Sequence, residues 1–266
     1  MNRAVVNGVE FAYEDEGRSE HAIVLVHGHP FNRSMWRPQI DAVSRAAWRT
    51  IAPDLRGYGA SAVVPGVTPL DLFAADIFGL LDHLEIASAV FVGLSMGGQI
   101  VMECARSAPA RVRGLVLTAT FPQAEAEQGK VARRAMAERL LREGMGPYAN
   151  DVLPKMIAPH NIAAFPDVAA DVLAMMTATP PEGAAAALRG RAERPPYEST
   201  LAQFERPALV IVGDHDAFTT RADADNMHRL LKQSRLYWME GAGHMPNLER
   251  PTEFNTALLE FLSTLT

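Results

Sequence analysis

The pattern Gly93-Leu94-Ser95-Met96-Gly97 could present a serine hydroxyl for nucleophilic attack. An apolar run, residues 90–92, precedes it, and residues 99–108 continue with apolar and small side chains at helical spacing. A strand, a tight turn and a helix in this order expose a serine at the tip of the strand. Gly93 and Gly97 allow strand and helix to approach because they have no Cβ. A serine hydroxyl is a weak nucleophile alone, so the chain must also supply a base.

Three further loops follow predicted strands and carry polar side chains that could complete this chemistry. Residues 213–218 contain two aspartates, residues 240–247 contain His244, and residues 27–30 contain two histidines. The carboxyl ends of parallel strands share one edge of a sheet, so these loops should converge near Ser95. We predict that His244 is the general base, because an imidazole can take the serine proton and later return it.

A carboxylate must hold that imidazole in the correct tautomer and stabilise its cation. Asp214 and Asp216 both qualify by residue type. Asp216 lies further from the strand end, where its side chain can reach across to His244, whereas Asp214 is expected to hydrogen-bond within its own turn. We therefore predict Ser95, Asp216 and His244 as the catalytic residues, and Asp214 is the alternative acid.

Apolar runs alternate with amphipathic helical spacing along most of the chain, which indicates an α/β fold with a mostly parallel sheet. Besides the strand before Ser95, strands are expected at residues 3–6, 9–13, 23–26, 49–52, 112–118, 208–212 and 236–239. Helices are expected from residue 34 to 47, from 69 to 84, from 221 to 231 and from 252 to 262. Residues 121–194 show helical spacing and repeated prolines but no strand. We predict a helical cap (lid) at 121–194 and a core domain formed by 1–120 and 195–266.

Several of these motifs together resemble the α/β-hydrolase family. The order serine, acid, histidine is the order of that family. The sequence also carries His27-Gly28-His29-Pro30, similar to the family's oxyanion loop, and Asp54-Leu55-Arg56-Gly57-Tyr58-Gly59-Ala60-Ser61, similar to its structural loop. Gly213-Asp214-His215-Asp216 and Gly241-Ala242-Gly243-His244 match its acid turn and histidine loop. The resemblance implies an eight-stranded, mostly parallel sheet flanked by helices, with a lid inserted after the sixth strand. It also implies an oxyanion hole made by the backbone N–H groups of His29 and Met96.

The resemblance further implies a serine hydrolase that cleaves a carboxylic ester or lactone through an acyl-enzyme. Ser-Met-Gly-Gly and a compact lid are similar to 3-oxoadipate enol-lactonase-like hydrolases and small carboxylesterases. The alternatives are a C–C bond hydrolase of the meta-cleavage type and a cofactor-free perhydrolase or haloperoxidase. A further alternative, of a different class, is a protein of this fold that binds a small ligand and signals through a partner.

The lid should set the substrate, since methionines suit an adaptable apolar pocket. We expect Phe31, Phe121, Met156 and Met245 to line the substrate pocket, and we leave open whether the His29 side chain contacts substrate or only packs. No cation of the lid stands out as a clamp for a carboxylate. The basic residues of the segment, which alternate with glutamates, are expected on a solvated helix face: Lys130, Arg133, Arg134, Arg139 and Arg142.

Composition excludes other classes of function. The 266 residues carry a net charge of −6 without a basic stripe, so nucleic acid is not an expected partner. No run approaches 18 apolar residues and the N-terminus has no apolar signal core, so we expect a cytoplasmic protein that does not act at a membrane. The single cysteine, Cys104, is expected to pack in the core. His27-x-His29 continues with Pro30-Phe31-Asn32 rather than Asp-His, so we expect no metal. No dinucleotide motif or other cofactor is indicated, and the oligomeric state is left open.

Overall fold

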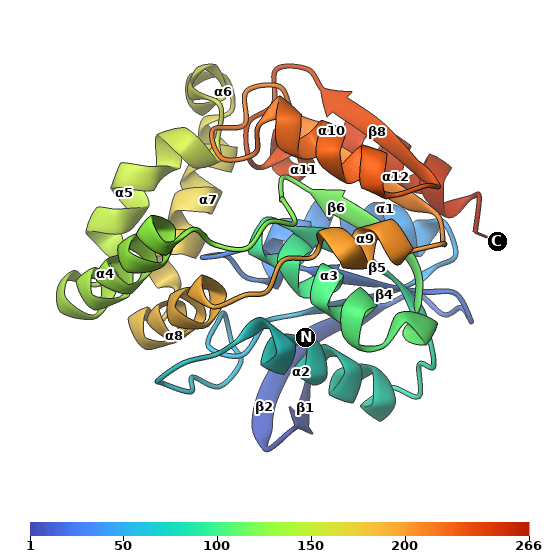
Figure 1. The fold of residues 1–266 in the computed structure, drawn as a ribbon, viewed down its shortest axis with the longest axis horizontal. Coiled ribbons are helices and arrows are strands. Elements are labelled where there is room, and N and C mark those ends of the chain that lie inside the picture. Colours follow the sequence, from blue (N-terminus) through green and yellow to red (C-terminus); the bar gives the residue numbers. More distant parts are fainter. Residues whose placement is uncertain (266) are drawn as a thin grey trace.

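A computed structural model describes residues 1–265 of the chain as one eight-stranded sheet with helices on both faces (Figure 1). The strands lie in the order β1-β2-β4-β3-β5-β6-β7-β8. Only β2 is antiparallel to its neighbours, β1 and β4, and the other pairs are parallel. The strands are β1 (Asn2–Val6), β2 (Val9–Glu16), β3 (Ala22–Val26), β4 (Arg49–Pro53), β5 (Ala89–Leu94), β6 (Val112–Thr118), β7 (Ala208–Gly213) and β8 (Ser234–Met239). This architecture confirms the predicted fold class.

The central strands β3, β5 and β7 consist of residues that are all buried. A parallel strand covered by helices on both faces needs apolar side chains on both sides, which explains the continuous apolar runs of these segments. Because these three strands run in the same direction, the loops that follow them leave the sheet at the same edge. They are the three loops with His29, Ser95 and Asp216.

Two layers of helices cover the sheet, each with its own apolar core cluster. Residues of α2 (Leu70–His83), α3 (Met96–Ser107), α9 (Glu198–Gln203) and α10 (Arg221–Leu230) pack in one cluster. Residues of the 3₁₀ helix η1 (Arg33–Trp36), α1 (Arg37–Arg45) and α12 (Pro251–Leu262) pack in the other. Two short elements complete the core, η2 (Pro109–Arg111) and α11 (Pro246–Glu249). Cys104 lies buried in α3 with a free thiol, as expected.

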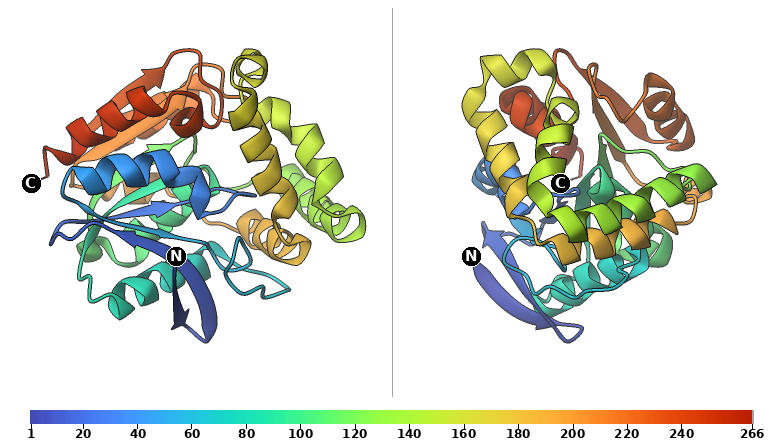
Figure 2. Two further views of the ribbon diagram at one scale, coloured as in Figure 1. Left: turned by 180° about the vertical axis from the view of Figure 1, so that it is seen from behind. Right: turned by 90° about the vertical axis from the view of Figure 1, so that its left-hand side faces the viewer.

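Five helices come between β6 and α9, and we call them the helical insertion. They are α4 (Glu127–Glu143), α5 (Met145–Met156), α6 (Pro159–Ala164), α7 (Pro166–Ala178) and α8 (Pro181–Ala192). Figures 1 and 2 show them gathered at one end of the sheet. The insertion follows the sixth strand, as the family resemblance implied; the division into domains at residues 121 and 194 stays a prediction. Within residues 1–265, no helix combines the length and hydropathy needed to cross a membrane.

Prolines account for two differences from the predicted helices. The segment predicted as one helix over residues 34–47 is split into η1 and α1, because Pro38 stands in the first turn of α1. The short helix expected at residues 152–157 is the end of the longer α5, which contains Pro154. Pro154 is two residues from the C-terminus of α5, so it interrupts only the final turn.

Candidate active site

Ser95 stands between β5 and α3 with a strained backbone. Its φ is 56° and its ψ is −115°, so it occupies the left-handed side of φ that side chains other than glycine rarely adopt. Its N–H donates to Thr118 O at 2.9 Å, and its own carbonyl accepts from Thr120 Oγ1 at 2.8 Å. Bonds to the end of β6 and to the loop after it therefore hold the turn on both sides of Ser95. Strain of this kind is found at functional sites, where the surroundings maintain it.

Small residues make the approach of strand, helix and loop possible here. A Cβ on Gly93 would lie 2.2 Å from Gly97 O, and a Cβ on Gly97 would lie 2.1 Å from Val26 O. Gly28 also approaches the turn, since its Cβ would lie 3.3 Å from Ser95 Cβ. These distances explain the glycines on both sides of Ser95, and they place the loop after β3 directly against the serine.

His244 and Asp216 form a buried pair on the two neighbouring loops. His244 Nδ1 lies 3.0 Å from Asp216 Oδ1 and 3.1 Å from Oδ2, and both side chains have almost no exposed surface. The carboxylate also accepts the N–H groups of Phe218 at 2.8 Å and Thr219 at 3.2 Å. With the carboxylate as acceptor, Nδ1 carries the proton and Nε2 is left free to accept one.

The electrostatics of this pair favour an ionised carboxylate. Burial by itself would raise the pKa of Asp216. The charge and hydrogen bond of His244 and the two backbone N–H groups outweigh burial, so the pKa of Asp216 lies below its ordinary value. Asp214, the alternative acid, is not part of the pair: its side chain is 35% exposed and its carboxylate lies 4.0 Å from His215.

A second buried carboxylate, Glu249, holds the histidine loop. Its Oε1 accepts the N–H groups on either side of His244, from Gly243 at 2.9 Å and from Met245 at 3.2 Å. Its Oε2 accepts Ala158 N at 2.9 Å and Asn161 Nδ2 at 2.7 Å, both in the helical insertion. Glu249 therefore fixes the backbone of His244 to the insertion. Sequence reasoning missed this residue because most of its partners are backbone N–H groups, which carry no signal of their own, and because Ala158 and Asn161 lie far away in the chain.

The two residues whose backbone N–H groups the family resemblance implied as an oxyanion hole, Met96 and His29, both lie close to Ser95 in the chain or in space. Met96 is the first residue of α3, so its N–H is among the amides at the helix start that have no partner within the helix. His29 follows Gly28 in the loop that lies against Ser95. Donors of this type, oriented at a developing oxyanion, each contribute roughly 3 kcal/mol to transition-state stabilisation.

The two histidines of the oxyanion loop have different surroundings. His27 Nε2 accepts Leu55 N at 2.9 Å, so its Nδ1 donates to Gly28 O at 2.9 Å, and no lone pair is left for a metal. His29 Nδ1 lies 2.8 Å from the Tyr58 hydroxyl, while its Nε2 is buried without a partner. Burial and the charge of Arg191 hold the pKa of His29 well below its ordinary value, so its ring is neutral.

A cavity of about 220 Å³ brings Ser95 and His244 together. It is smaller than the roughly 300–1,000 Å³ typical of sites for drug-sized ligands, so it fits a small substrate. The residues that line it come from core and insertion: His29, Ser95, Ala119, Phe121, Arg133, Tyr148, Met156, Leu188, Arg191, Phe218 and His244. Of the four residues expected in the substrate pocket, Phe121 and Met156 are in this lining. Phe31 and Met245 are buried in the core and are not part of it.

The two arginines of the lining correct a further expectation. Arg133 was expected on a solvated face and no cation of the lid stood out, but Arg133 and Arg191 both line the cavity with Ser95. One feature of the sequence could have indicated that Arg191 is buried, although not that it lines the cavity. Residues 183–188 and residue 190, which precede it in α8, are glycine, alanine or leucine, and a segment that is apolar around the helix is expected to be buried. Indeed, a Cβ on Gly190 would lie 1.8 Å from Thr68 O.

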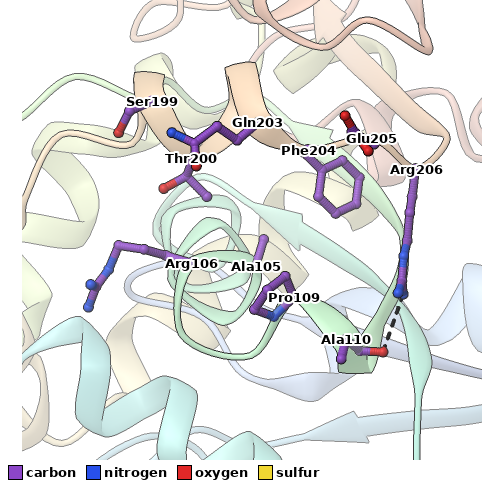
Figure 3. Close-up of a pocket in the computed structure, with 10 residues that line it drawn as sticks. All are labelled: Ala105, Arg106, Pro109, Ala110, Ser199, Thr200, Gln203, Phe204, Glu205 and Arg206. Carbon is purple, nitrogen blue, oxygen red and sulfur yellow. Dashed lines mark hydrogen bonds between the residues drawn. The ribbon is translucent and has the colours of Figure 1, made fainter.

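A second hollow, of about 530 Å³, lies between the C-terminal end of α3, η2 and α9 (Figure 3). Both arginines of its lining already have partners. Arg106 is paired with Glu103 at 2.6 Å, and Arg206 donates to Ala110 O at 3.3 Å. None of the predicted site residues lies there, so the cavity around Ser95 is the candidate active site.

Comparisons with known proteins agree with this arrangement. A model of the alpha/beta hydrolase family matches residues 23–257. The chain is 30% identical to "3-oxoadipate enol-lactonase 2" of Acinetobacter baylyi, over 94% of this chain and 92% of that protein. Among solved structures, a thermophilic esterase from Thermogutta terrifontis with malate bound has a TM-score of 0.96 and 35% identity, covering 100% of this chain and 99% of that one. The enol-lactonase from Burkholderia xenovorans LB400 has a TM-score of 0.91 and 30% identity, covering 98% and 100%.

Proposed function

The chain belongs to the α/β-hydrolase family of enzymes, and we propose that it hydrolyses a carboxylic ester or lactone through an acyl-enzyme on Ser95. One observation carries the proposal: the buried His244–Asp216 pair lies beside Ser95, and Ser95 and His244 line one cavity. The names of the enol-lactonases and the esterase to which the chain is similar support the same substrate class.

Acylation begins when Ser95 Oγ attacks the carbonyl carbon and His244 Nε2 takes the hydroxyl proton. The carbonyl electrons move to the oxygen, and the N–H groups of Met96 and His29 stabilise that oxyanion. Asp216 holds the imidazolium by its Nδ1–H. When the intermediate collapses, the C–O bond to the alcohol breaks and His244 gives its proton to the leaving alkoxide.

Deacylation repeats these steps with water as the nucleophile. His244 takes a proton from the water, the hydroxide attacks the acyl carbon, and the proton passes to Ser95 as the acid is released. For a lactone, the alcohol and the acid are two ends of the same product. The cavity of about 220 Å³ favours a small acyl group or a small ring.

The test is hydrolysis of short p-nitrophenyl esters and small lactones by the native protein and by Ser95→Ala. We expect a stoichiometric burst of p-nitrophenolate and steady turnover from the native protein, and loss of both in the variant. Ser199→Ala, a change at an exposed serine of α9 outside the cavity, should retain native activity. If native protein and Ser95→Ala hydrolyse the whole panel equally slowly, the proposed function is wrong.

A further inference from the structure

The guanidinium of Arg191 lies in the wall of the Ser95 cavity without an acidic partner. Only 8% of the residue is exposed. Its Nε donates to Gln99 Oε1 at 2.7 Å, and this amide is neutral. Among residues 1–265, no carboxylate oxygen lies within ion-pair distance, 4.0 Å, of Arg191. A buried charge with no counterion is costly, so the structure leaves a place for an anion.

Positive charges also outnumber negative charges around Arg191. Arg133 and Arg194 share one carboxylate, that of Glu125, so three guanidinium groups face a single acid. Burial and the charges of Arg133 and Arg194 lower the pKa of Arg191, which reflects the same repulsion. A guanidinium nevertheless stays protonated in proteins. The cavity lining contains two of these arginines and no aspartate or glutamate.

A second unpaired polar atom points to the same place. His29 lines the cavity, and its Nε2 is buried without a partner. When the Tyr58 hydroxyl donates to His29 Nδ1, the neutral ring carries its proton on Nε2, where it can donate to a ligand. The cavity therefore offers hydrogen-bond donors from Arg191 and His29 in addition to the backbone N–H groups near Ser95.

The position of Arg191 relative to the serine sets the length of the ligand. Gln99, which holds Arg191, follows Ser95 by four residues in α3, and its N–H donates to Ser95 O at 3.2 Å. Arg191 and Ser95 also line the same cavity of about 220 Å³. Because this cavity is small, an anion on Arg191 would be separated by only a few bonds from a carbonyl carbon attacked by Ser95.

We propose that Arg191, together with Arg133, binds a carboxylate of the substrate. The substrate class is then a small ester or lactone that carries a free carboxylate a few bonds from the scissile carbonyl. A guanidinium matches the two oxygens of a carboxylate in a bidentate pair, which orients the substrate as well as binding it. This proposal rests on the proposed hydrolysis at Ser95 and adds the chemistry that selects the substrate.

The experiment compares pairs of esters that differ only in charge. Monomethyl glutarate is paired with methyl 4-carbamoylbutanoate, which places the charge in the acyl group. The pair 4-acetoxybutanoate and 4-acetoxybutanamide places it in the alcohol. Methanol or acetate release gives kcat/KM for native protein and for Arg191→Gln, Arg191→Lys and Arg189→Gln. Arg189 is the matched control, because it lies in the same helix but points outward to Glu138 at 2.7 Å.

In at least one pair, we expect the native protein to prefer the anionic ester by roughly 30-fold in kcat/KM, the size of one charge-assisted bidentate contact. The ratio should fall towards one in Arg191→Gln, take an intermediate value in Arg191→Lys, and stay at the native value in Arg189→Gln. The native ratio is a sufficient test if Arg191→Gln does not fold. A native ratio of one or below in both pairs overturns the carboxylate site. In that case, Ser95-dependent cleavage of the ester bond in the uncharged compounds would leave the proposed function intact.

Measurements of ligand affinity test the carboxylate site at Arg191 independently of the proposed hydrolysis at Ser95. Calorimetry with Ser95→Ala protein measures the affinity for the same esters without turnover. We expect the anionic ester of the preferred pair to bind at least tenfold more tightly than the uncharged ester of that pair. Equal affinities in both pairs overturn the carboxylate site. A clear preference in binding with no turnover by native protein supports the site and contradicts the hydrolase function.

Discussion

Replacing Glu249 with glutamine should slow catalysis although Glu249 contacts neither substrate nor the ring of His244. The carboxylate accepts four N–H groups, two on each oxygen. A glutamine side chain keeps the size but turns one oxygen into an NH₂ group. Whichever way the amide lies, that NH₂ faces N–H donors: either those of Gly243 and Met245, or those of Ala158 and Asn161.

The magnitude follows from the bonds that are lost. A buried N–H without an acceptor costs about 1–3 kcal/mol, so losing the acceptor of two should lower the free energy of unfolding by about 3 kcal/mol. For a chain of this size that is a decrease of about 6–12 °C in Tm. The effect on rate arises from the His244 backbone, which loses its support. A displacement near 1 Å at a catalytic group can cost about 100-fold, so we expect kcat to fall about 10- to 100-fold.

The assay is steady-state hydrolysis of the best ester of the panel, well below the Tm of the variant. A positioning role predicts that kcat falls while KM changes less than about threefold, because the substrate contacts remain. Glu253→Gln is the matched control. Glu253 is an exposed glutamate in the first turn of α12, four residues further along the chain. Its loss should leave kcat and Tm close to the native values.

A decreased Tm with native kcat would refute this reasoning, because it would show that Glu249 only stabilises the fold. An increase in KM with constant kcat would indicate that Glu249 supports the substrate pocket instead. Neither result would bear on the nucleophile, which the Ser95→Ala comparison tests separately.

Two further predictions concern the acid. Asp216→Asn should lower kcat for ester hydrolysis about 10³- to 10⁴-fold, because an amide cannot hold His244 in the required tautomer. The kcat of Asp214→Asn should stay within about threefold of the native value. A larger loss in Asp214→Asn than in Asp216→Asn would assign the acid to Asp214. The pKa of Asp216 is lower in the folded than in the unfolded chain, so its ionised form stabilises the fold above roughly pH 4 and this contribution disappears as pH falls through the folded pKa. Urea unfolding from neutral to acid pH should therefore show a smaller loss of stability below roughly pH 4 in Asp216→Asn than in native protein; identical slopes would contradict it.

The elements that carry the site were predictable because each depends on local sequence. The fully apolar runs of β3, β5 and β7 identify strands covered on both faces, and the residues directly after them are at the same sheet edge by topology alone. The glycines around Ser95 are equally local, since the strand and helix they separate are adjacent in the chain. Sequence reasoning could therefore place Ser95 and Asp216 at one edge of the sheet, and it could add His244 because its loop follows the next strand, β8.

The wall of the cavity was not predictable in the same way. Arg133 and Arg191 are 58 positions apart and belong to different helices of the insertion, and their charges resemble those of any solvated helix. Their location depends on how α4 and α8 pack against each other, and the spacing of apolar residues within each helix does not predict that packing. The prediction that Phe31 and Met245 line the cavity was wrong for a related reason. They follow glycine- and proline-rich loops whose path decides whether a side chain faces the cavity or the core.

The helical insertion contributes residues to the wall of the cavity, and it also holds the loops on which the proposed chemistry depends. Glu249 connects the histidine loop to residues at the start of α6, and Thr179 Oγ1, just after α7, donates to Pro30 O at 2.8 Å in the oxyanion loop. The same insertion contributes Arg191 to the cavity wall. A displacement of these helices would therefore change the positions of the proposed base, the proposed oxyanion donors and the proposed anion site together. It follows that substitutions that displace these helices should alter kcat and substrate preference jointly, even where they touch neither Ser95 nor His244.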